Sequence, residues 1–252
     1  MCRHLAYVGP AVPLATWLLD PPNSLVQQSF APTRQRHGVV NADGFGVGWF
    51  TAPGLAPVRH RSASPVWADE TFHDLARTQR ATALLSSVRS ATATTAYGVG
   101  AAMPFRSGVW LFSHNGALTG WPDAAVPLAR QLDVARLLRL DAMTDAAVLW
   151  ALTLELLQAG VPPPQAVADV VARAAKVCGG RLNLLLTDGQ QIVATAWGDS
   201  LSYRAGDPDA GVLVASEPLE DTAGWLDVPD QCLLHITPGP AGAAHHVTVT
   251  PI

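Results

Sequence analysis

The strongest constraint on the fold is a pair of long helical segments that follow each other in the middle of a chain otherwise built from short strands. Thr144 is a suitable N-cap for a helix over Asp145–Gln158, in which four apolar side chains share one face. A second helix is expected over 165–177, ending at Gly179-Gly180. Because strands are expected before and after this pair, the pattern indicates an α+β fold of two antiparallel sheets packed face to face with helices outside.

The expected strands are short and are separated by turn residues. Asp188-Gly189 stands between two apolar runs, and such a turn signal is typical of antiparallel pairing. Short helices are expected over 14–19, before Asp20-Pro21-Pro22, and over 70–77. The expected strands cover residues 2–9, 44–51, 83–88, 109–112, 182–187, 191–197, 211–216, 232–236 and 246–250.

Composition narrows the class of protein. With 252 residues, 49% hydrophobic and 14% charged, the chain is expected to fold as one globular domain over residues 1–252. A net charge of -4 without a lysine or arginine run disfavours nucleic acid or an anionic membrane as the main partner and favours a small-molecule ligand. Three cysteines, no secretory signal pattern and no stretch of ~18 apolar residues predict a reduced, cytoplasmic protein.

Cys2 follows the initiator Met1, and this position makes the start of the chain a candidate nucleophile. Because cysteine is small, we expect Met1 to be removed, which leaves a thiol and a free α-amine on one residue. An α-amino group titrates near pH ~7.7–8.0 and a thiol near ~8.5, so the neutral amine can take the thiol proton directly or through one water. A cysteine at position two also occurs by chance, so the catalytic interpretation depends on the neighbouring motifs.

The segment Ser113-His114-Asn115-Gly116 follows an apolar strand and has two interpretations. An Asn-Gly pair flanked by apolar residues is a strong hairpin signal, so the segment alone is predicted to form a tight turn. The same turn would hold the Asn115 side-chain amide and the Gly116 N–H as two fixed donors. Such donors stabilise the oxyanion that forms when a thiolate attacks an amide carbonyl.

Arg89 and Asp145 are candidate ligands for the charges of an amino acid, and each has a structural alternative. Arg89 emerges at the end of an apolar strand, where a rim salt bridge is the usual outcome. Asp145 stands in a first helical turn, where a carboxylate is favourable against the helix dipole. A guanidinium fork also binds carboxylates, and a carboxylate pairs with an ammonium group. Together the two residues would bracket the charges of an α-amino acid.

Gly44, Gly46 and Gly48 alternate along an expected strand and therefore share one face. Without side chains there, another backbone or a ligand can come close, while Val47 and Trp49 pack on the opposite face. No Lys-Ser or Lys-Thr pair follows, and the glycines lead into a strand, so this is not a phosphate loop.

Taken together, these segments resemble the class II glutamine amidotransferases, which are N-terminal-nucleophile hydrolases. Their order and rough spacing agree with that family, and within it the chain is most similar to the stand-alone amidohydrolase of ergothioneine biosynthesis. Segments 181–183, 195–199, 215–218 and 224–229 extend the match towards the C-terminus. The most specific matches are Cys2-Arg3-His4-Leu5, His37-Gly38, residues 41–48, Val88-Arg89-Ser90-Ala91-Thr92, His114-Asn115-Gly116 and Thr144-Asp145.

The resemblance implies a four-layer αββα sandwich and a role for each matching residue. It makes Cys2 the nucleophile with its α-amine as general base, and it makes Asn115 and Gly116 the oxyanion hole. Arg89 would bind the α-carboxylate of a glutamyl group, and Asp145 would bind its α-amine. The implied reaction is hydrolysis of γ-glutamyl-hercynylcysteine sulfoxide to glutamate and hercynylcysteine sulfoxide through a thioester, without a metal or other cofactor.

Around Thr92 the chain both matches the family and departs from it. Thr92 stands where a family threonine contacts the substrate. Family members that supply ammonia tend to carry a tryptophan before and a histidine after the Ala-Thr pair, whereas Ser90 and Ala93 flank it here. The departure concerns the leaving-group side of the pocket and not the glutamyl side.

The implied leaving group carries a trimethylammonium group, which aromatic faces bind by cation–π attraction worth roughly 0.5–2 kcal/mol. Phe45, Trp49, Trp67 and Trp225 are candidates for that contact, and packing in the core is the alternative for each.

Two other functions are compatible with the same residues. One is a glutaminase subunit that hands ammonia to a synthase, which would be a separate protein because no second catalytic domain precedes Ile252. The other is a binding module without activity, in which Met1 is retained and the α-amine of Cys2 is never freed. The sequence says nothing about oligomeric state.

Overall fold

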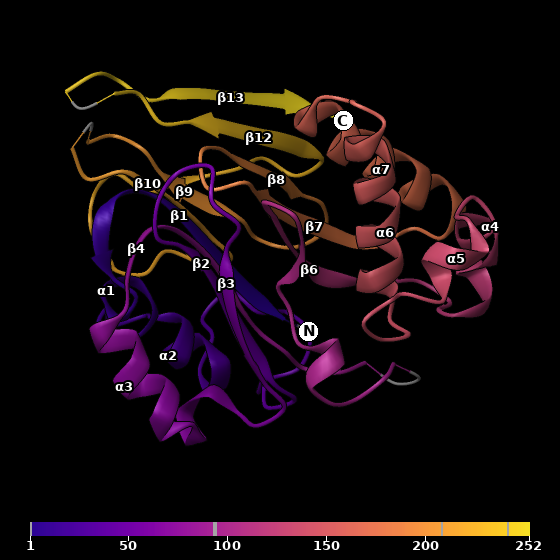
Figure 1. Ribbon diagram of the computed structural model, residues 1–252, viewed down its shortest axis with the longest axis horizontal. Coiled ribbons are helices and arrows are strands. Elements are labelled where there is room, and N and C mark those ends of the chain that lie inside the picture. The colour runs from indigo at the N-terminus through magenta and orange to yellow at the C-terminus, as the bar shows by residue number, and fades with distance from the viewer. Residues whose placement is uncertain (1, 93–94, 208, 241) are drawn as a thin grey trace.

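The computed structural model describes residues 2–92, 95–207, 209–240 and 242–252, whose strands form two antiparallel sheets (Figure 1). Sheet A has the order β11-β9-β10-β1-β4-β2-β3, and sheet B has the order β13-β12-β8-β7-β6-β5. The strands of sheet A are β1 Arg3–Pro13, β2 Phe45–Phe50, β3 Val58–Ser62, β4 Arg80–Val88, β9 Ser202–Arg204, β10 Val212–Ala215 and β11 Leu226–Asp227. Those of sheet B are β5 Phe105–Ser107, β6 Trp110–Leu118, β7 Gly180–Thr187, β8 Ile192–Ala196, β12 Cys232–Thr237 and β13 His246–Pro251.

The helices lie outside the two sheets. In Figure 1, α1, α2 and α3 lie on the side of sheet A, and α6 and α7 lie on the opposite side, against sheet B. None of the helices among the described residues is long and apolar enough to cross a bilayer. The helices are α1 Ala15–Leu18, α2 Leu25–Phe30, α3 Glu70–Thr78, α4 Val126–Ala129, α5 Val134–Leu137, α6 Asp145–Gln158 and α7 Pro163–Val177, with short 3-10 turns η1 Val66–Ala68, η2 Val99–Ala101 and η3 Asp123–Ala125.

Strand β1 shows why the layers form. Its side chains alternate between the two faces of sheet A, and both faces are apolar. Ala6 and Val8 pack between the sheets in a cluster that includes Leu185 of sheet B, whereas Leu5 and Tyr7 join a second cluster with the side chains of α1 and α3. A third cluster lies between sheet B and the pair α6 and α7. Three buried interfaces make four layers, so the predicted αββα sandwich is confirmed.

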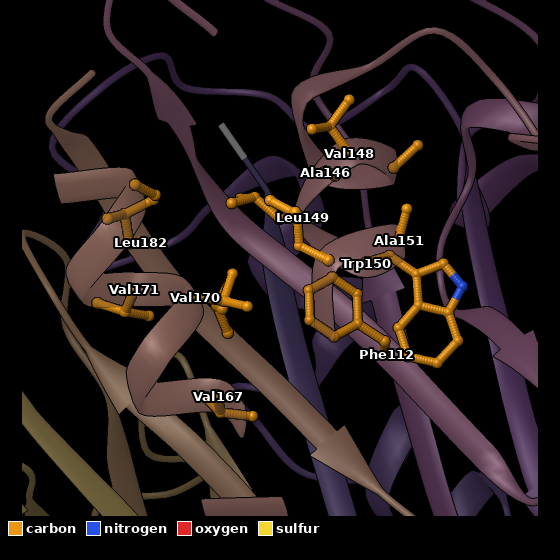
Figure 2. Packing of buried hydrophobic residues seen from close by; sticks show 14 of the residues in the cluster. Phe112, Ala146, Val148, Leu149, Trp150, Ala151, Val167, Val170, Val171 and Leu182 are labelled. Carbon is orange, nitrogen blue, oxygen red and sulfur yellow. The ribbon is translucent and has the colours of Figure 1, made fainter. Parts of the chain in front are cut away.

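Helix α6 is anchored on sheet B along its first half. Thr144 caps it by accepting a hydrogen bond from the Ala147 backbone N–H at 3.1 Å, as predicted. The ring of Trp150 stacks on Phe112 of β6 with centroids 5.3 Å apart, and the valines of α7 pack beside them (Figure 2). Each such apolar side chain contributes about 1.5–3 kcal/mol on burial. This packing places the N-terminus of α6, and with it Asp145, at a fixed point beside β6.

The alternating glycines of β2 allow close approach, as predicted. A Cβ on Gly46 would lie 2.5 Å from the Met103 carbonyl oxygen, and one on Gly48 would lie 2.6 Å from the Leu111 side chain of sheet B. Val47 and Trp49 pack on the opposite face with the helices of that side. The glycines therefore bring sheet B and the segment around Met103 against sheet A.

Candidate active site

One cleft at the end of both sheets brings together most of the predicted site residues. Cys2, which directly precedes β1, lines it and is 7% exposed. The cleft has a volume of about 20 Å³, and its walls also include Arg89, Thr92, Gly116 and Asp145. These residues come from both sheets and from α6, so only the folded chain assembles the site. The expected removal of Met1 concerns a residue outside those described.

Asn115 and Gly116 lie within strand β6, so the predicted tight turn is wrong. Asn115 pairs with Asn183, and Gly116 pairs with Leu182 of β7. A Cβ on Gly116 would lie 1.9 Å from the Arg181 carbonyl oxygen, so glycine is required at this position. The strand continues through the Asn-Gly pair because β7 supplies partners along its whole length, and the local turn signal is overridden.

Asn115 is fully buried between the sheets and does not line the cleft in this structure. Its Nδ2 donates to the Ser216 hydroxyl at 3.4 Å, and the same hydroxyl accepts from the His4 backbone N–H at 3.0 Å. Its Oδ1 is buried without a hydrogen-bond partner among the described residues. Ser216 therefore connects the Asn115 side chain to β1, the strand that begins directly after Cys2.

Arg89 follows β4 and is 4% exposed. Its guanidinium donates to the Ala96 carbonyl at 2.7 Å and to the Thr95 hydroxyl at 3.3 Å. The predicted alternative of a rim salt bridge is wrong, because Arg89 has no ion pair with any described carboxylate. A buried guanidinium without a counter-ion favours an anionic ligand.

Asp145 stands in the first turn of α6 and is 7% exposed. Its carboxylate accepts hydrogen bonds from the Leu118 N–H at 3.0 Å and from the N–H of its neighbour Ala146 at 2.8 Å. It has no ion pair with a cation of the described residues. The helix dipole offsets part of the negative charge, and the carboxylate remains able to accept from an ammonium group.

Thr92 and Ser90 line the same cleft, whereas Ala93 lies outside the described residues. The Thr92 carbonyl accepts from the Thr95 hydroxyl at 2.7 Å, and that hydroxyl accepts from the Arg89 guanidinium at 3.3 Å. The backbone around Arg89 is further held by Asp43, whose carboxylate accepts from the Ala91 N–H at 2.7 Å. The segment beyond β4 is thus tied back to the start of β2.

His4 supports the site from between the sheets. It is fully buried, and its Nδ1 lies 2.9 Å from the Ser113 hydroxyl. Burial, together with the charge of Arg3 and the nearby His114, lowers the pKa of His4 to about 3. The imidazole is therefore neutral at cellular pH and acts as part of the core beneath Cys2.

Two ion pairs stand beside the cleft. Arg3 and Glu217 are both fully buried and lie 3.4 Å apart, and Arg181 lies 3.2 Å from the Asp199 carboxylate. Burial lowers the pKa of Arg3 and Glu217 opposes that effect, while burial raises the pKa of Asp199 against the opposing charge of Arg181. These pairs hold the strand ends around Cys2 in place.

The four aromatic residues predicted as candidates for a quaternary ammonium group line neither this cleft nor the larger hollow described below. Phe45 and Trp49 are buried in the core under the helices of sheet A. Trp67 packs edge-on against Phe30, and Trp225 has Arg204 over its ring at 5.5 Å. Phe45 and Trp49 therefore serve core packing, which was the alternative interpretation.

Sequence reasoning assigned no individual role to Ser216, Asp43 or Met103. Met103 lines the cleft, and its sulfur accepts from the His114 backbone N–H at 3.2 Å. Ser216 lies in a segment that carries the family resemblance, which was the only available signal for it. Their contacts depend on residues far away in the chain, so spacing alone could not have indicated them.

The family model of the class II glutamine amidotransferases matches residues 22–204. The chain therefore belongs to the class II glutamine amidotransferase family.

The relatives of the chain carry a name that is more specific than the family's, because it states one substrate. The gamma-glutamyl-hercynylcysteine sulfoxide hydrolase of Mycobacterium tuberculosis (strain CDC 1551 / Oshkosh) is 41% identical over 239 residues, 94% of this chain and 93% of that protein. The protein of the same name from Mycolicibacterium smegmatis is 38% identical over 252 residues, 100% of both chains.

Solved structures share the fold. A glutamine aminotransferase class-II domain protein from Silicibacter pomeroyi has a TM-score of 0.68 and 24% identity, and the match covers 98% of both chains. The glutamine phosphoribosylpyrophosphate amidotransferase of B. subtilis has a TM-score of 0.67 and 16% identity, with 98% of this chain and 49% of that one covered.

Proposed function

We propose that the protein hydrolyses the γ-glutamyl amide bond of γ-glutamyl-hercynylcysteine sulfoxide, a step of ergothioneine biosynthesis, and releases glutamate and hercynylcysteine sulfoxide. One observation carries this proposal: a buried guanidinium and a buried carboxylate, each without an oppositely charged partner among the described residues, line the same cleft as Cys2. The names of relatives at 38% and 41% identity support the same substrate.

The α-amino acid end of the glutamyl group supplies the missing charges. Its α-carboxylate binds Arg89 and its α-ammonium binds Asp145, while Thr92 contacts the group between them. The cleft of about 20 Å³ holds little more than one water, so binding widens it. The substrate carboxylate then takes over guanidinium donors that now bond Ala96 and Thr95. This anchoring directs the γ-carbonyl towards Cys2.

Removal of Met1 frees the α-amine of Cys2, which acts as the general base. The amine takes the thiol proton, the sulfur attacks the γ-carbonyl, and the same proton passes to the departing nitrogen as the C–N bond breaks. The product amine leaves, and a γ-glutamyl thioester remains on Cys2. Water, deprotonated by the amine, then attacks the thioester; the C–S bond breaks, the thiol is restored and glutamate leaves.

The negative oxygen of each tetrahedral intermediate is held by the Gly116 N–H and the Asn115 side-chain amide. Gly116 borders the cleft directly. Asn115 donates one Nδ2 hydrogen to Ser216, so a second remains for the oxyanion after a small rotation. Neither the metal nor the cofactor of other hydrolases is needed in this mechanism. The thiol has to stay reduced, which fits a cytoplasmic enzyme.

The decisive experiment measures glutamate release from the sulfoxide conjugate and from L-glutamine by wild type and by Cys2→Ala. We expect wild type to prefer the conjugate and Cys2→Ala to lose about 10⁴-fold or more of the rate, as for removal of other covalent nucleophiles. Intact-mass measurement of the wild type should show a chain that begins at Cys2.

Three other results would contradict the proposal. Preference for L-glutamine would indicate a glutaminase subunit that supplies ammonia to a separate synthase. Retention of Met1 in a protein without turnover would indicate a binding module. Equal release by wild type and Cys2→Ala would remove the thioester from the mechanism.

A further inference from the structure

A second hollow, of about 650 Å³, lies at the same end of the sheets as the cleft. Its walls are residues 33–36, residues 198–201, and Asp227, Val228 and Asp230. It shares no lining residue with the cleft. The volume falls within the range of about 300–1,000 Å³ that is usual for small-molecule sites. The cleft itself, at about 20 Å³, has to widen even for the glutamyl end of a conjugate and leaves no room for the other half.

The first wall of the hollow is joined to the residue next to the nucleophile. Gln35 lines the hollow, and its Oε1 accepts from the Arg3 Nε at 3.1 Å. Glu217, the ion-pair partner of Arg3, accepts from the Thr33 N–H at 2.7 Å and from its hydroxyl at 2.6 Å. The segment 33–36 is therefore fixed to the start of β1, one residue from Cys2.

The second wall is joined to the proposed oxyanion donor. The Ser200 hydroxyl donates to the Ser216 carbonyl at 2.8 Å, and the Ser216 hydroxyl accepts from Asn115. Asn183, which pairs with Asn115 across the strands, donates to the carbonyls of Asp199 at 3.0 Å and Ser200 at 3.1 Å. Asn115 is thus linked through Ser216 to the wall of the hollow, and its neighbour Gly116 lines the cleft.

The order of sheet A sets the direction of the substrate. Arg89 follows β4 on one side of β1, whereas the hollow lies beyond β10 and β9 on the other side. With the glutamyl group held on the Arg89 side and its carbonyl at Cys2, the departing nitrogen faces the hollow. The hollow is therefore where the other half of the substrate extends.

The charged side chains of the hollow fit the leaving half of the substrate. Arg34 and Asp227 neutralise each other at 2.6 Å, and Asp199 is paired with Arg181. Arg36 lines the hollow and has no side-chain partner among the described residues, while Asp230 accepts only one hydrogen bond, from the Gly198 N–H at 2.7 Å. One guanidinium and one carboxylate thus remain for a ligand that itself carries both signs of charge.

We propose that this hollow is the leaving-group subsite, in which Arg36 binds a carboxylate and Asp230 faces the trimethylammonium group of the hercynyl end. This inference rests on the proposed function, because the ligand is the amine product of that reaction. It also explains how a quaternary ammonium group is bound although the aromatic candidates point elsewhere. By chemical class, the ligand is an amino acid whose nitrogen is trimethylated, that is a betaine, joined to a second amino acid.

The test compares kcat/KM for the sulfoxide conjugate with kcat/KM for L-glutamine, which lacks the leaving half. In Arg36→Gln we expect the ratio of the two to fall about fivefold, and in Asp230→Asn about threefold, because both side chains are exposed. The inhibition constant of free hercynylcysteine sulfoxide should rise by similar factors. Arg130→Gln and Asp74→Asn are matched controls, because both residues are exposed and line neither the cleft nor the hollow; they should keep the wild-type ratio.

The outcomes separate the two proposals. A wild type that prefers the conjugate, with Arg36→Gln and Asp230→Asn indistinguishable from the controls in both ratio and product inhibition, would overturn the subsite and leave the function standing. A wild type without preference for the conjugate would overturn the proposed function and the subsite with it. Circular dichroism and the unfolding midpoint of each variant show that the fold is kept.

Discussion

The cleft and the hollow lie side by side but are built in different ways. Cys2, Arg89 and Asp145 are each at most 7% exposed and stand at the ends of strands or in the first turn of a long helix. In the hollow, the side chains of Arg34 and Asp227 are 40% and 66% exposed. In the proposed mechanism, the glutamyl end is thus bound by groups that the core fixes, and the leaving half by groups on the surface.

The difference has an energetic consequence. A buried charge interacts strongly with a ligand charge because little water screens it, whereas an exposed pair contributes about 0–1 kcal/mol. Loss of a cleft residue should therefore affect every γ-glutamyl substrate strongly. Loss of a hollow residue should change only the choice among leaving groups, and by small factors. The following experiments test that division, in order of expected effect.

Asn115→Ala tests whether Asn115 takes part in the chemistry or serves structure alone. We expect kcat to fall about 10²–10³-fold with KM little changed, because the side-chain donor is used only when the oxyanion forms. Steady-state kinetics with both the conjugate and L-glutamine provide the measurement. A decrease of equal size for the two substrates assigns Asn115 to the chemistry, while a decrease confined to the conjugate would assign it to the hollow instead.

Asp145→Asn keeps the shape of the side chain and removes the charge that faces the substrate ammonium. We expect kcat/KM to fall about 30- to 100-fold for both substrates, mainly through KM, since the charge binds the ground state and the transition state alike. Asp133→Asn is the matched control. Asp133 caps α5 through a hydrogen bond from the Ala135 N–H at 2.8 Å and lies outside the cleft. An unaltered KM in Asp145→Asn would show that the ammonium binds elsewhere.

His4 allows a test of how far the cleft depends on the core. Its pKa of about 3 lies below the ordinary value of 6.5, so the unfolded state binds the proton first as pH falls. The stabilisation from neutral His4 is complete above pH 6.5 and is lost by up to about 1.4 kcal/mol per pH unit between 6.5 and 3.

Urea unfolding of wild type and His4→Gln at pH 7, 6 and 5 measures this effect. The free energy of unfolding should fall more steeply with acid in the wild type, and the exposed His246→Gln should follow the wild type. Parallel curves for wild type and His4→Gln would mean that folding does not lower the pKa of His4.

The sequence predicted those parts of the fold whose signals are local. Both ends of α6 were predicted because Thr144 supplies the cap and apolar residues recur at helical spacing. Five residues of the cleft were predicted because each stands in a short, family-like motif: Cys2, Arg89, Thr92, Gly116 and Asp145. Met103, which also lines the cleft, stands in no such motif. The turn at Asn115-Gly116 was wrong because strand pairing with β7 decides the conformation there, and the partner of Asn115 is Asn183, 68 residues further on.

The hollow could not have been predicted in the same way. Its walls come from three segments far apart in the chain, around Gln35, Ser200 and Asp230, whose residue types are typical of any surface loop. What brings them together is a set of hydrogen bonds to Arg3, Glu217 and Ser216, and these appear only when β1 and β10 pair. Short strands such as β9 and β11 likewise depend on distant partners.

The position of Cys2, buried and one residue ahead of the first strand, bears on how the enzyme should be produced. The proposed mechanism requires a free α-amine on Cys2, so an affinity tag fused in front of the chain would block it, and residues left after proteolytic cleavage would do the same. The other terminus lies well apart from the first in Figure 1. A fusion after Ile252 is therefore the arrangement that leaves the proposed general base free.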